Sequence, residues 1–379
     1  MPTQSTRLPF IDALKAVALQ LIVLHHLAFY GPMSDHAYPL LPDLFTWLSE
    51  HARIAVQVFL VIGGFLAARS LAPGRVLLSP QPLQLLLKRY LKLVVPYLAA
   101  LLIGIACAAI ARVLMTHDSV PASPTLPQVL AHALLLQGVL GYDGLSAGVW
   151  YVAIDFQLFT LLLLTLWLAR GLGRSPVPMA LVSALLVATL ALASLYHFNR
   201  DPAWDNWALY FFASYALGVL SYWLAKPQHA LGWLLLIVAA VATALLLDYR
   251  SRIAVALMVA LALALARRYR ILENWPHSRL LAYLGQISYA VFLIHFPICL
   301  LINALFARFI APDPWSNLAG IVLAWLASIA AGGTLYRFVE RPAERWFRRP
   351  RSLNLTESLS TTPPQATQSS SECHPHPLV

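Results

Sequence analysis

Apolar stretches of about 20 residues recur along nearly the whole chain, and no other feature of the sequence constrains the fold as strongly. A helix of about 20 residues spans roughly 30 Å, the thickness of the hydrocarbon core of a bilayer. The stretches are continuously apolar, so they do not show the two-residue alternation of an outer-membrane β-barrel. Only 11% of the residues are charged, against roughly a quarter in soluble proteins. The expected fold class is therefore all-α, as a polytopic integral membrane protein.

About ten transmembrane helices are expected, and the first is retained because it lacks a small-residue cleavage site. The short apolar segment 126–141 is expected to be interfacial or re-entrant. From residue 350 the composition turns to Ser, Thr, Gln, Pro and Asn. We therefore expect a transmembrane domain over 1–349 and a disordered cytoplasmic tail over 350–379. The expected spans are 9–30, 53–72, 93–114, 148–169, 177–197, 208–225, 229–248, 252–267, 282–306 and 316–337.

The distribution of basic residues predicts the orientation of these spans. With both termini in the cytoplasm, all but six of the 26 Lys and Arg residues lie on the cytoplasmic side. Such an asymmetry is what the positive-inside rule describes. The net charge of +10 is thus a topology signal, and no nucleic-acid partner is expected. The six residues on the opposite side are Arg53, Arg112, Arg200, Arg250, Arg252 and Arg308.

Ionisable residues at membrane depth are the candidate functional residues, because each is costly there. Lys15 and His26 lie eleven residues apart on the first expected helix. That spacing returns to within about 20° of the same face and rises roughly 16 Å. The lysine suits contact with an anionic group, and a neutral buried imidazole suits general base catalysis on a hydroxyl. The alternative is that Lys15 reaches to the interface and His26 bonds a neighbouring helix.

Two further ionisable residues lie inside expected spans. Asp155 should be paired or protonated, with His26 or an Arg or Lys side chain as its partner. A structural ion pair and a catalytic role both fit it. His295 follows Ser288 and Tyr289 by about two turns and comes just before Pro297. The alternative to a functional role for His295 is a hydrogen bond to a neighbouring helix.

A basic cluster follows the second expected span. Lys88, Arg89 and Lys92 fall within about one helical turn, and Arg69 precedes them. Ordinary positive-inside charge or binding of anionic lipid explains such a cluster when it is taken alone.

Six runs, in order along the chain, resemble the motifs of the acyltransferase-3 family, and the likeness covers roughly residues 7–347. In the first run, R-L-P-F-I-D-A-L-K-A, Asp12 and Lys15 occupy motif positions, and His26 stands at the family's histidine position. The chain departs from the family where Lys15 replaces an arginine, Gly63 a serine and Asp155 a glutamate. Lysine lacks the bidentate geometry of arginine, so donor contacts, the acyl group or the acceptor are expected to differ. The other runs are Val58–Leu66 followed by Arg69, Lys88–Tyr97, Trp150–Phe159, Ser288–Pro297 and Glu340–Pro342.

The resemblance implies a membrane O-acyltransferase of the bacterial inner membrane. It would move an acyl group from a cytoplasmic acyl-CoA, most often acetyl-CoA with succinyl-CoA as the alternative, to a hydroxyl of a periplasmic or cell-surface glycan. His26 would be the base or a transient acyl carrier, and Asp155 would orient or tune the site. Contact with the donor would come from Lys15, Arg69 and Arg89. Other polar membrane sites are Asp12, Ser288, Tyr289, His295 and Glu340.

The expected partners are acyl-CoA as co-substrate, a glycan acceptor, the lipid bilayer and proteins of glycan assembly. No bound cofactor and no metal are expected, since His374 and His376 in the tail are too isolated for a metal site. The acceptor stays open among O-antigen, capsule, periplasmic glucan and other glycosides. The main alternative function is a transporter or flippase of glycan or lipid, which would also place ionisable groups at mid-membrane. A structural or regulatory membrane subunit is the second alternative.

Overall fold

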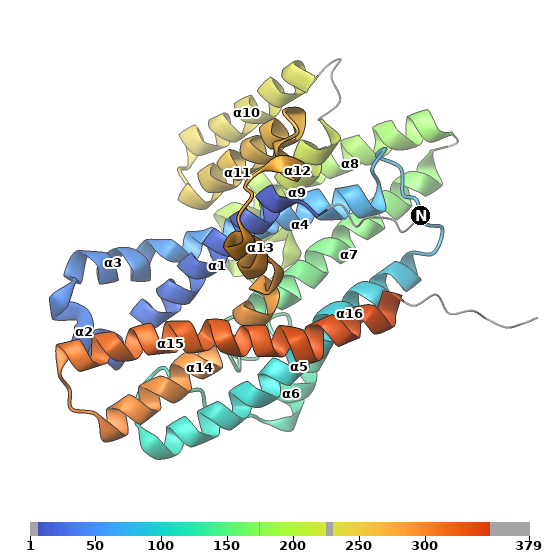
Figure 1. Cartoon of the computed structure of the whole chain (residues 1–379). Helices are drawn as coiled ribbons and strands as arrows, with labels where there is room; N and C mark the ends of the chain where they lie inside the picture. The colour runs from blue at the N-terminus through green and yellow to red at the C-terminus, as the bar shows by residue number, and fades with distance from the viewer. Residues whose placement is uncertain (1–6, 174, 225–229, 349–379) are drawn as a thin grey trace, which may run out of the picture. The chain divides into compact units, whose positions relative to one another are not determined.

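The computed structural model describes residues 7–173, 175–224 and 230–348, and every regular element in these ranges is helical (Figure 1). The predicted all-α class is therefore confirmed. The predicted disordered tail over 350–379 lies outside the described residues. So does Lys226, one of the basic residues that the charge distribution assigns to the cytoplasmic side.

Each of the ten predicted spans overlaps one long helix over most of its length. These helices are α1 (Pro9–Phe29), α4 (Val56–Leu71), α5 (Pro82–Leu114), α7 (Val149–Leu172), α8 (Pro176–Tyr196), α9 (Ala208–Trp223), α10 (Ala230–Leu247), α11 (Ser251–Arg268), α14 (Ser288–Phe309) and α15 (Pro314–Leu335). Short elements connect them: α2 (Met33–Ala37), η1 (Tyr38–Leu40), α3 (Pro42–His51), η2 (Ala52–Ala55), α6 (Leu126–Ala133), η3 (Phe198–Arg200), η4 (Pro202–Trp204), α12 (Ile271–Asn274), α13 (Arg279–Gln286), η5 (Tyr336–Glu340) and α16 (Arg341–Arg348).

Seven helical segments of the described chain are long and apolar enough to cross a membrane. They contain α1, α4, α5, α7, α8, α14 and α15. Helices α9 and α10 are apolar but shorter, and α11 carries Arg252, Arg267 and Arg268. The multi-pass architecture is thus supported, whereas the count of ten and the cytoplasmic termini stay predictions.

Two helix boundaries differ from the predicted spans. Helix α5 begins at Pro82 rather than near residue 93, because proline favours the first helical turn and the residues that follow it are mostly leucine. The basic cluster therefore lies on a continuous helix and not in a loop. Helix α14 begins at Ser288, six residues later than predicted, because α13 ends at Gln286 and a new helix follows.

The segment after α5 forms no spanning helix. Helix α6 has eight residues and is capped by a Thr125–Gln128 capping box. Eight residues rise only about 12 Å, which agrees with the predicted interfacial or re-entrant segment.

Helices α4 and α9 approach closely through glycines. A Cβ atom on Gly64 would collide with the backbone carbonyl of Tyr215, and one on Gly218 would collide with that of Val61. Small residues permit such backbone contact between membrane helices. The close approach places Tyr215 of α9 beside the motif residues of α4.

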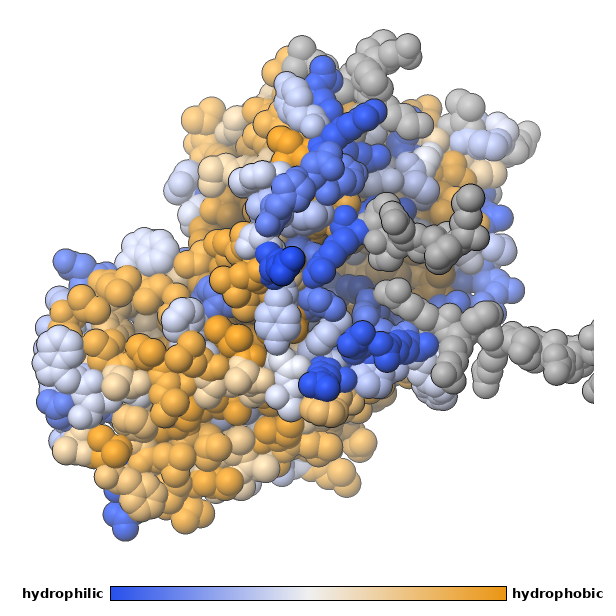
Figure 2. Space-filling model, in the orientation of Figure 1, coloured by the Kyte–Doolittle hydropathy of each residue, from blue (hydrophilic) through white to orange (hydrophobic). Residues whose placement is uncertain are grey.

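Figure 2 shows hydrophilic residues gathered over α12, α13 and α16, whereas apolar residues cover α14 and α15. The exposed basic residues of this part of the chain are Arg268, Arg270, Arg279, Arg337, Arg341 and Arg345. All six belong to the set that the charge distribution assigns to the cytoplasm.

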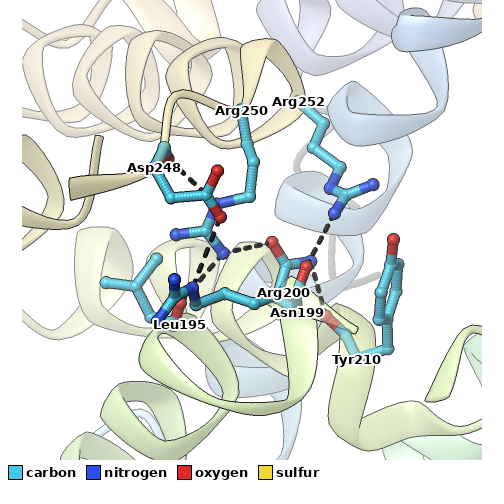
Figure 3. A network of polar contacts seen from close by, with 7 residues as sticks. All are labelled: Leu195, Asn199, Arg200, Tyr210, Asp248, Arg250 and Arg252. Carbon is cyan, nitrogen blue, oxygen red and sulfur yellow. Dashed lines mark hydrogen bonds and ion pairs between the residues drawn. The ribbon is translucent and has the colours of Figure 1, made fainter. Parts of the chain in front are cut away.

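The loops after α8 and α10 are joined by a polar network (Figure 3). Arg250 is buried, and its Nη1 donates to the carbonyl of Leu195 at 2.9 Å and to Oδ1 of Asn199 at 2.8 Å. Arg252 donates to the Asn199 carbonyl at 2.6 Å and lies over the ring of Tyr210. Arg250 thereby satisfies a carbonyl in the last turn of α8, where cations are favoured by the helix dipole, and Arg252 satisfies one in η3. Arg250 and Arg252, which the charge distribution assigns to the side opposite the cytoplasm, therefore have a structural role.

Replacing Arg250 by alanine should destabilise the fold by about 1–3 kcal/mol, because buried acceptors would lose their donors. The measurement is thermal unfolding of the detergent-solubilised protein. Arg200→Ala is the matched control, since Arg200 is exposed and forms only a 3.4 Å ion pair with Asp248, a type of contact worth about 1 kcal/mol or less. Equal unfolding temperatures for the two variants would contradict the structural role.

Candidate active site

Two histidines from helices far apart in the sequence meet inside the bundle. His26 of α1 and His295 of α14 are both buried, at 7% and 0% exposure. Nδ1 of His26 lies 2.6 Å from Nε2 of His295, and the two rings stack with their centroids 4.9 Å apart. The predicted candidate His26 is therefore joined directly to His295, the predicted candidate on α14.

The hydrogen bonds of His295 determine the tautomer of both rings. Nδ1 of His295 lies 2.7 Å from the carbonyl of Phe292 and 3.2 Å from that of Val291. A carbonyl only accepts, so Nδ1 of His295 carries the proton and Nε2 is the acceptor. The short contact then requires the Nδ1–H of His26 to donate to His295. Nε2 of neutral His26 is left with its lone pair, as a general base or nucleophile requires.

The surroundings of His26 are aromatic. Its ring lies 4.9 Å from that of His25 and 5.5 Å from that of Tyr30, between centroids. His25 has a different role, because its Nδ1 donates to the carbonyl of Leu48 at 3.0 Å. Only one of the two adjacent histidines is thus coupled to α14.

The buried carboxylate of Asp155 on α7 forms an ion pair with Arg89 of α5, whose side chain is partly exposed. The guanidinium also lies over the ring of Phe159, 5.3 Å from its centroid. The predicted partner set for Asp155 contained His26 and basic side chains, and the structure pairs it with Arg89. Because Arg89 lies on α5 and not in a loop, its guanidinium reaches the buried carboxylate on α7.

Gly63 and Tyr215 flank this ion pair. A Cβ atom on Gly63 would lie 3.5 Å from Oδ1 of Asp155 and 3.2 Å from Cε2 of Tyr215. A serine at this position, as in the resembled motif, would therefore bring a hydroxyl beside the carboxylate. Among the described residues, Nε of Arg89 and Oη of Tyr215 find no hydrogen-bond partner. Unsatisfied buried polar atoms are uncommon, and two of those in the described chain lie at this ion pair.

Aromatic side chains connect the ion pair to the histidine pair. Tyr151, one turn before Asp155 on α7, contacts Phe292 with 5.3 Å between the ring centroids. Phe292 in turn lies 5.9 Å from the ring of His295. The two polar centres therefore belong to one continuous buried region.

The remaining predicted site residues lie toward the start of α1 and α14. Asp12 accepts from Nε of Arg7 at 2.8 Å, and Lys15 lies 3.4 Å from the same carboxylate. Lys15 therefore pairs with Asp12 and not with the histidines. Arg69 lies in the last turn of α4, and Glu340 is buried in η5.

Ser288 and Tyr289 make local contacts at the start of α14. The hydroxyl of Ser288 donates to the carbonyl of Gly285 at 2.9 Å. That of Tyr289 donates to the carbonyl of Leu93 on α5 at 2.9 Å. Both bonds anchor the beginning of α14, so these two residues position the helix that carries His295.

The sequence analysis missed Tyr215 as a neighbour of the ion pair. A tyrosine within the apolar run F-F-A-S-Y-A-L-G of α9 is the signal that could have identified it, since its hydroxyl needs a partner when buried. In the described part of the chain, no group of three or more His, Cys, Asp or Glu residues could hold a metal ion. The tail residues His374 and His376 lie outside that part.

A family model described as an acyltransferase domain matches residues 8–337, which is nearly the whole described chain. Searches of curated proteins and of solved structures each found no match.

Proposed function

The chain belongs to the family of this acyltransferase domain, and from that premise we propose that it is a membrane O-acyltransferase acting on a glycan. The donor is a cytoplasmic acyl-CoA, with acetyl-CoA as the first candidate and succinyl-CoA as the second. The acceptor is a hydroxyl of a periplasmic or cell-surface glycan, and the protein resides in a bacterial inner membrane. Proteins of glycan assembly are the proposed partners.

The observation that carries this proposal is the buried pair of His26 and His295, in which Nε2 of His26 keeps its lone pair. In the base route, the proton of the acceptor hydroxyl passes to Nε2 of His26. The hydroxyl oxygen then bonds to the thioester carbonyl carbon, the carbon–sulfur bond breaks, and the thiolate takes the proton back from the imidazolium. In the carrier route, Nε2 of His26 bonds the acyl carbon first, the carbon–sulfur bond breaks and the CoA thiolate leaves. The sugar hydroxyl oxygen then bonds to the acyl carbon, the bond from that carbon to Nε2 breaks, and the hydroxyl proton passes to the thiolate.

The order of Lys15 and His26 along α1 suits a donor that enters from the N-terminal end of this helix. Lys15 precedes His26 by eleven residues on α1, a rise of roughly 16 Å. Lys15 and Arg7 share the single carboxylate of Asp12, which leaves a net positive charge there. We propose that Lys15 and Arg69 contact the anionic part of acyl-CoA. Arg89 is neutralised by Asp155. Its unpartnered Nε would therefore donate to an uncharged part of the donor, and Asp155 would hold the guanidinium in place.

The proposal is tested with membrane vesicles whose cytoplasmic face points outward. They receive labelled acetyl-CoA or succinyl-CoA, and labelled acceptors are identified by mass spectrometry of glycans and lipids. Label on a glycan that depends on the protein is the expected result. If neither donor labels a glycan and unlabelled glycan crosses the membrane without acyl-CoA, the transporter alternative replaces this proposal.

His295 should act as a positioning residue for His26. Its replacement by leucine removes the acceptor for Nδ1–H of His26 and is expected to lower acyl transfer roughly 100-fold or more, because the tautomer and ring orientation would no longer be fixed. The measurement is the initial rate of label transfer at equal amounts of membrane protein.

His295→Gln separates positioning from a merely structural contribution. A glutamine oxygen can stand near the position of Nε2 and accept the same hydrogen bond, so this variant should recover part of the activity. If the leucine and glutamine variants unfold at the same temperature and have the same low activity, the hydrogen bond to His26 is not what matters.

A further inference from the structure

A polar pocket of about 290 Å³ lies beside the first turns of α7. Its walls come from the segment 137–144 after α6, from α7 itself, and from Asp205 and Asn206 before α9. Small-molecule sites in proteins have volumes of about 300–1,000 Å³, so this pocket has the size of a site for a small ligand or for one unit of a larger one.

The lining of the pocket selects against charged anions. Amides are supplied by Gln137, Gln157 and Asn206, and carboxylates by Asp143 and Asp205. The lining residues include no lysine, arginine or histidine. Amides donate to and accept from hydroxyls, and carboxylates accept from them, whereas two carboxylates repel an anionic ligand. The chemistry fits an uncharged ligand rich in hydroxyl groups.

Two lining amides are held in place by the fold. Gln137 is 2% exposed, and its Nε2 donates to the carbonyl of Val149 at 3.1 Å. Its Oε1 has no hydrogen-bond partner among the described residues. Oε1 of Gln157 accepts from the backbone N–H of Ala208 at 3.0 Å. A buried acceptor without a partner, on a side chain that lines a pocket, is a group available to a ligand.

One wall of the pocket is aromatic, and a glycine at its edge leaves room for Asn206. Trp150 lines it and is braced by the ring of Phe211, with 5.8 Å between centroids. The apolar C–H face of a sugar ring packs well on such a surface. At the edge, a Cβ atom on Gly138 would lie 2.8 Å from Oδ1 of Asn206, so the glycine lets Asn206 approach.

Phe292 connects the start of α7, which lines the pocket, to the histidine pair. Gly148, just before the lining residue Val149, abuts Phe292, with 3.1 Å from its Cβ position to that ring. Phe292 contacts His295. Asp155, by contrast, falls about 200° from the lining residues Ala153 and Gln157 at 100° per residue. The pocket and the ion pair therefore lie on different faces of α7, and Phe292 stands between the start of α7 and His295.

We propose that this pocket binds one uncharged sugar ring of the acceptor glycan, at a subsite next to the ring that is acylated. This inference rests on the proposed function, because it assigns a place to the acceptor of that reaction. A chain of sugars lying across the start of α7 would then present a neighbouring hydroxyl to His26.

The test is saturation-transfer NMR on the purified full-length protein with methyl glycosides of glucose, galactose, mannose, rhamnose and N-acetylglucosamine. The methyl glycoside of glucuronic acid is the charged counterpart. At least one neutral glycoside should bind, and the glucuronide should not. Asn206→Ala should weaken binding about tenfold through the loss of hydrogen bonds to the ligand. The matched control is Asp118→Asn, an exposed residue outside the pocket, which should leave binding unchanged.

The inference is overturned if no neutral glycoside binds, if the glucuronide binds equally well, or if Asn206→Ala binds as the wild type does. The assay needs no acyl-CoA, so it is independent of the acyltransferase proposal. Sugar binding that depends on Asn206, together with no acyl transfer in vesicles, would discard that proposal and retain the pocket as a sugar site. Acyl transfer to a glycan without sugar binding in the pocket would discard the sugar site and retain the acyltransferase proposal.

Discussion

The variant His26→Ala is expected to transfer acyl groups about 10²–10⁴ times more slowly than the wild type, the usual contribution of a general base. The reason is the hydrogen-bond arrangement that leaves Nε2 of His26 as the free acceptor. If His26 instead carries the acyl group, the loss should be at least as large, because the covalent route would be closed. The measurement is the initial rate of label transfer from acyl-CoA to the glycan in vesicles.

His25→Ala is the matched control for this experiment. His25 is adjacent in sequence and also buried, but it bonds the backbone carbonyl of Leu48. Its loss should affect stability more than turnover, so activity per folded molecule should stay within a few-fold of the wild type. Should His26→Ala keep the wild-type rate at a matched level of folded protein, His26 is structural and the proposed mechanism is wrong.

The long helices could be predicted from the sequence because hydropathy is a local property of the chain. All ten apolar stretches fall on helices, and the short segment after α5 does not span. The start of α5 was placed too late because Lys88, Arg89 and Lys92 lower the hydropathy of a stretch that is nonetheless helical. The end of α13 and the start of α14 were merged because both flanks are apolar and only the hydrogen-bonding pattern around Ile287 separates them.

Single site residues could be predicted from the sequence, whereas their pairing could not. An ionisable side chain inside an apolar run is visible in one sequence, which is why His26, Asp155 and His295 were candidates. His26 and His295 lie 269 residues apart in the sequence, and Arg89 and Asp155 lie 66 apart. Which helices become neighbours depends on packing across the bundle. From the sequence, Asp155 therefore had several candidate partners, and no contact between His295 and His26 was predicted.

The neighbours of Gly63 illustrate the same limit. The sequence shows a glycine where the resembled motif has a serine, but it does not say what that position faces. The structure places it against Asp155 and Tyr215. A departure that looks small in the motif thus changes the groups available to the buried carboxylate.

The ion pair of Arg89 and Asp155 should dominate the stability of this region. Arg89→Met alone is expected to lower the free energy of unfolding by about 3–5 kcal/mol, because it leaves the buried carboxylate of Asp155 unpaired. Asp155→Leu alone should cost less, because the Arg89 side chain is partly exposed. The double variant should recover most of that loss, since an apolar pair of similar volume can replace a buried ion pair. Thermal unfolding of the detergent-solubilised protein measures all three variants.

Lys92→Met is the control for removing a cation from the same helix. Lys92 lies three residues after Arg89, and its partner is Glu344 at 2.7 Å in a partly exposed pair. Such a pair contributes about 1 kcal/mol or less, so this variant should unfold close to the wild-type temperature. A loss as large as that of Arg89→Met would show that the effect comes from charge on α5 in general.

Activity of the double variant then separates the two roles that the ion pair can have. If Arg89 and Asp155 also position the donor, the double variant should be stable but transfer acyl groups far more slowly than the wild type. Their place beside the unpartnered hydroxyl of Tyr215 leads us to expect this outcome. Recovery of both stability and rate would instead mean that the ion pair only holds α5 to α7, and that the chemistry belongs to the histidine pair alone.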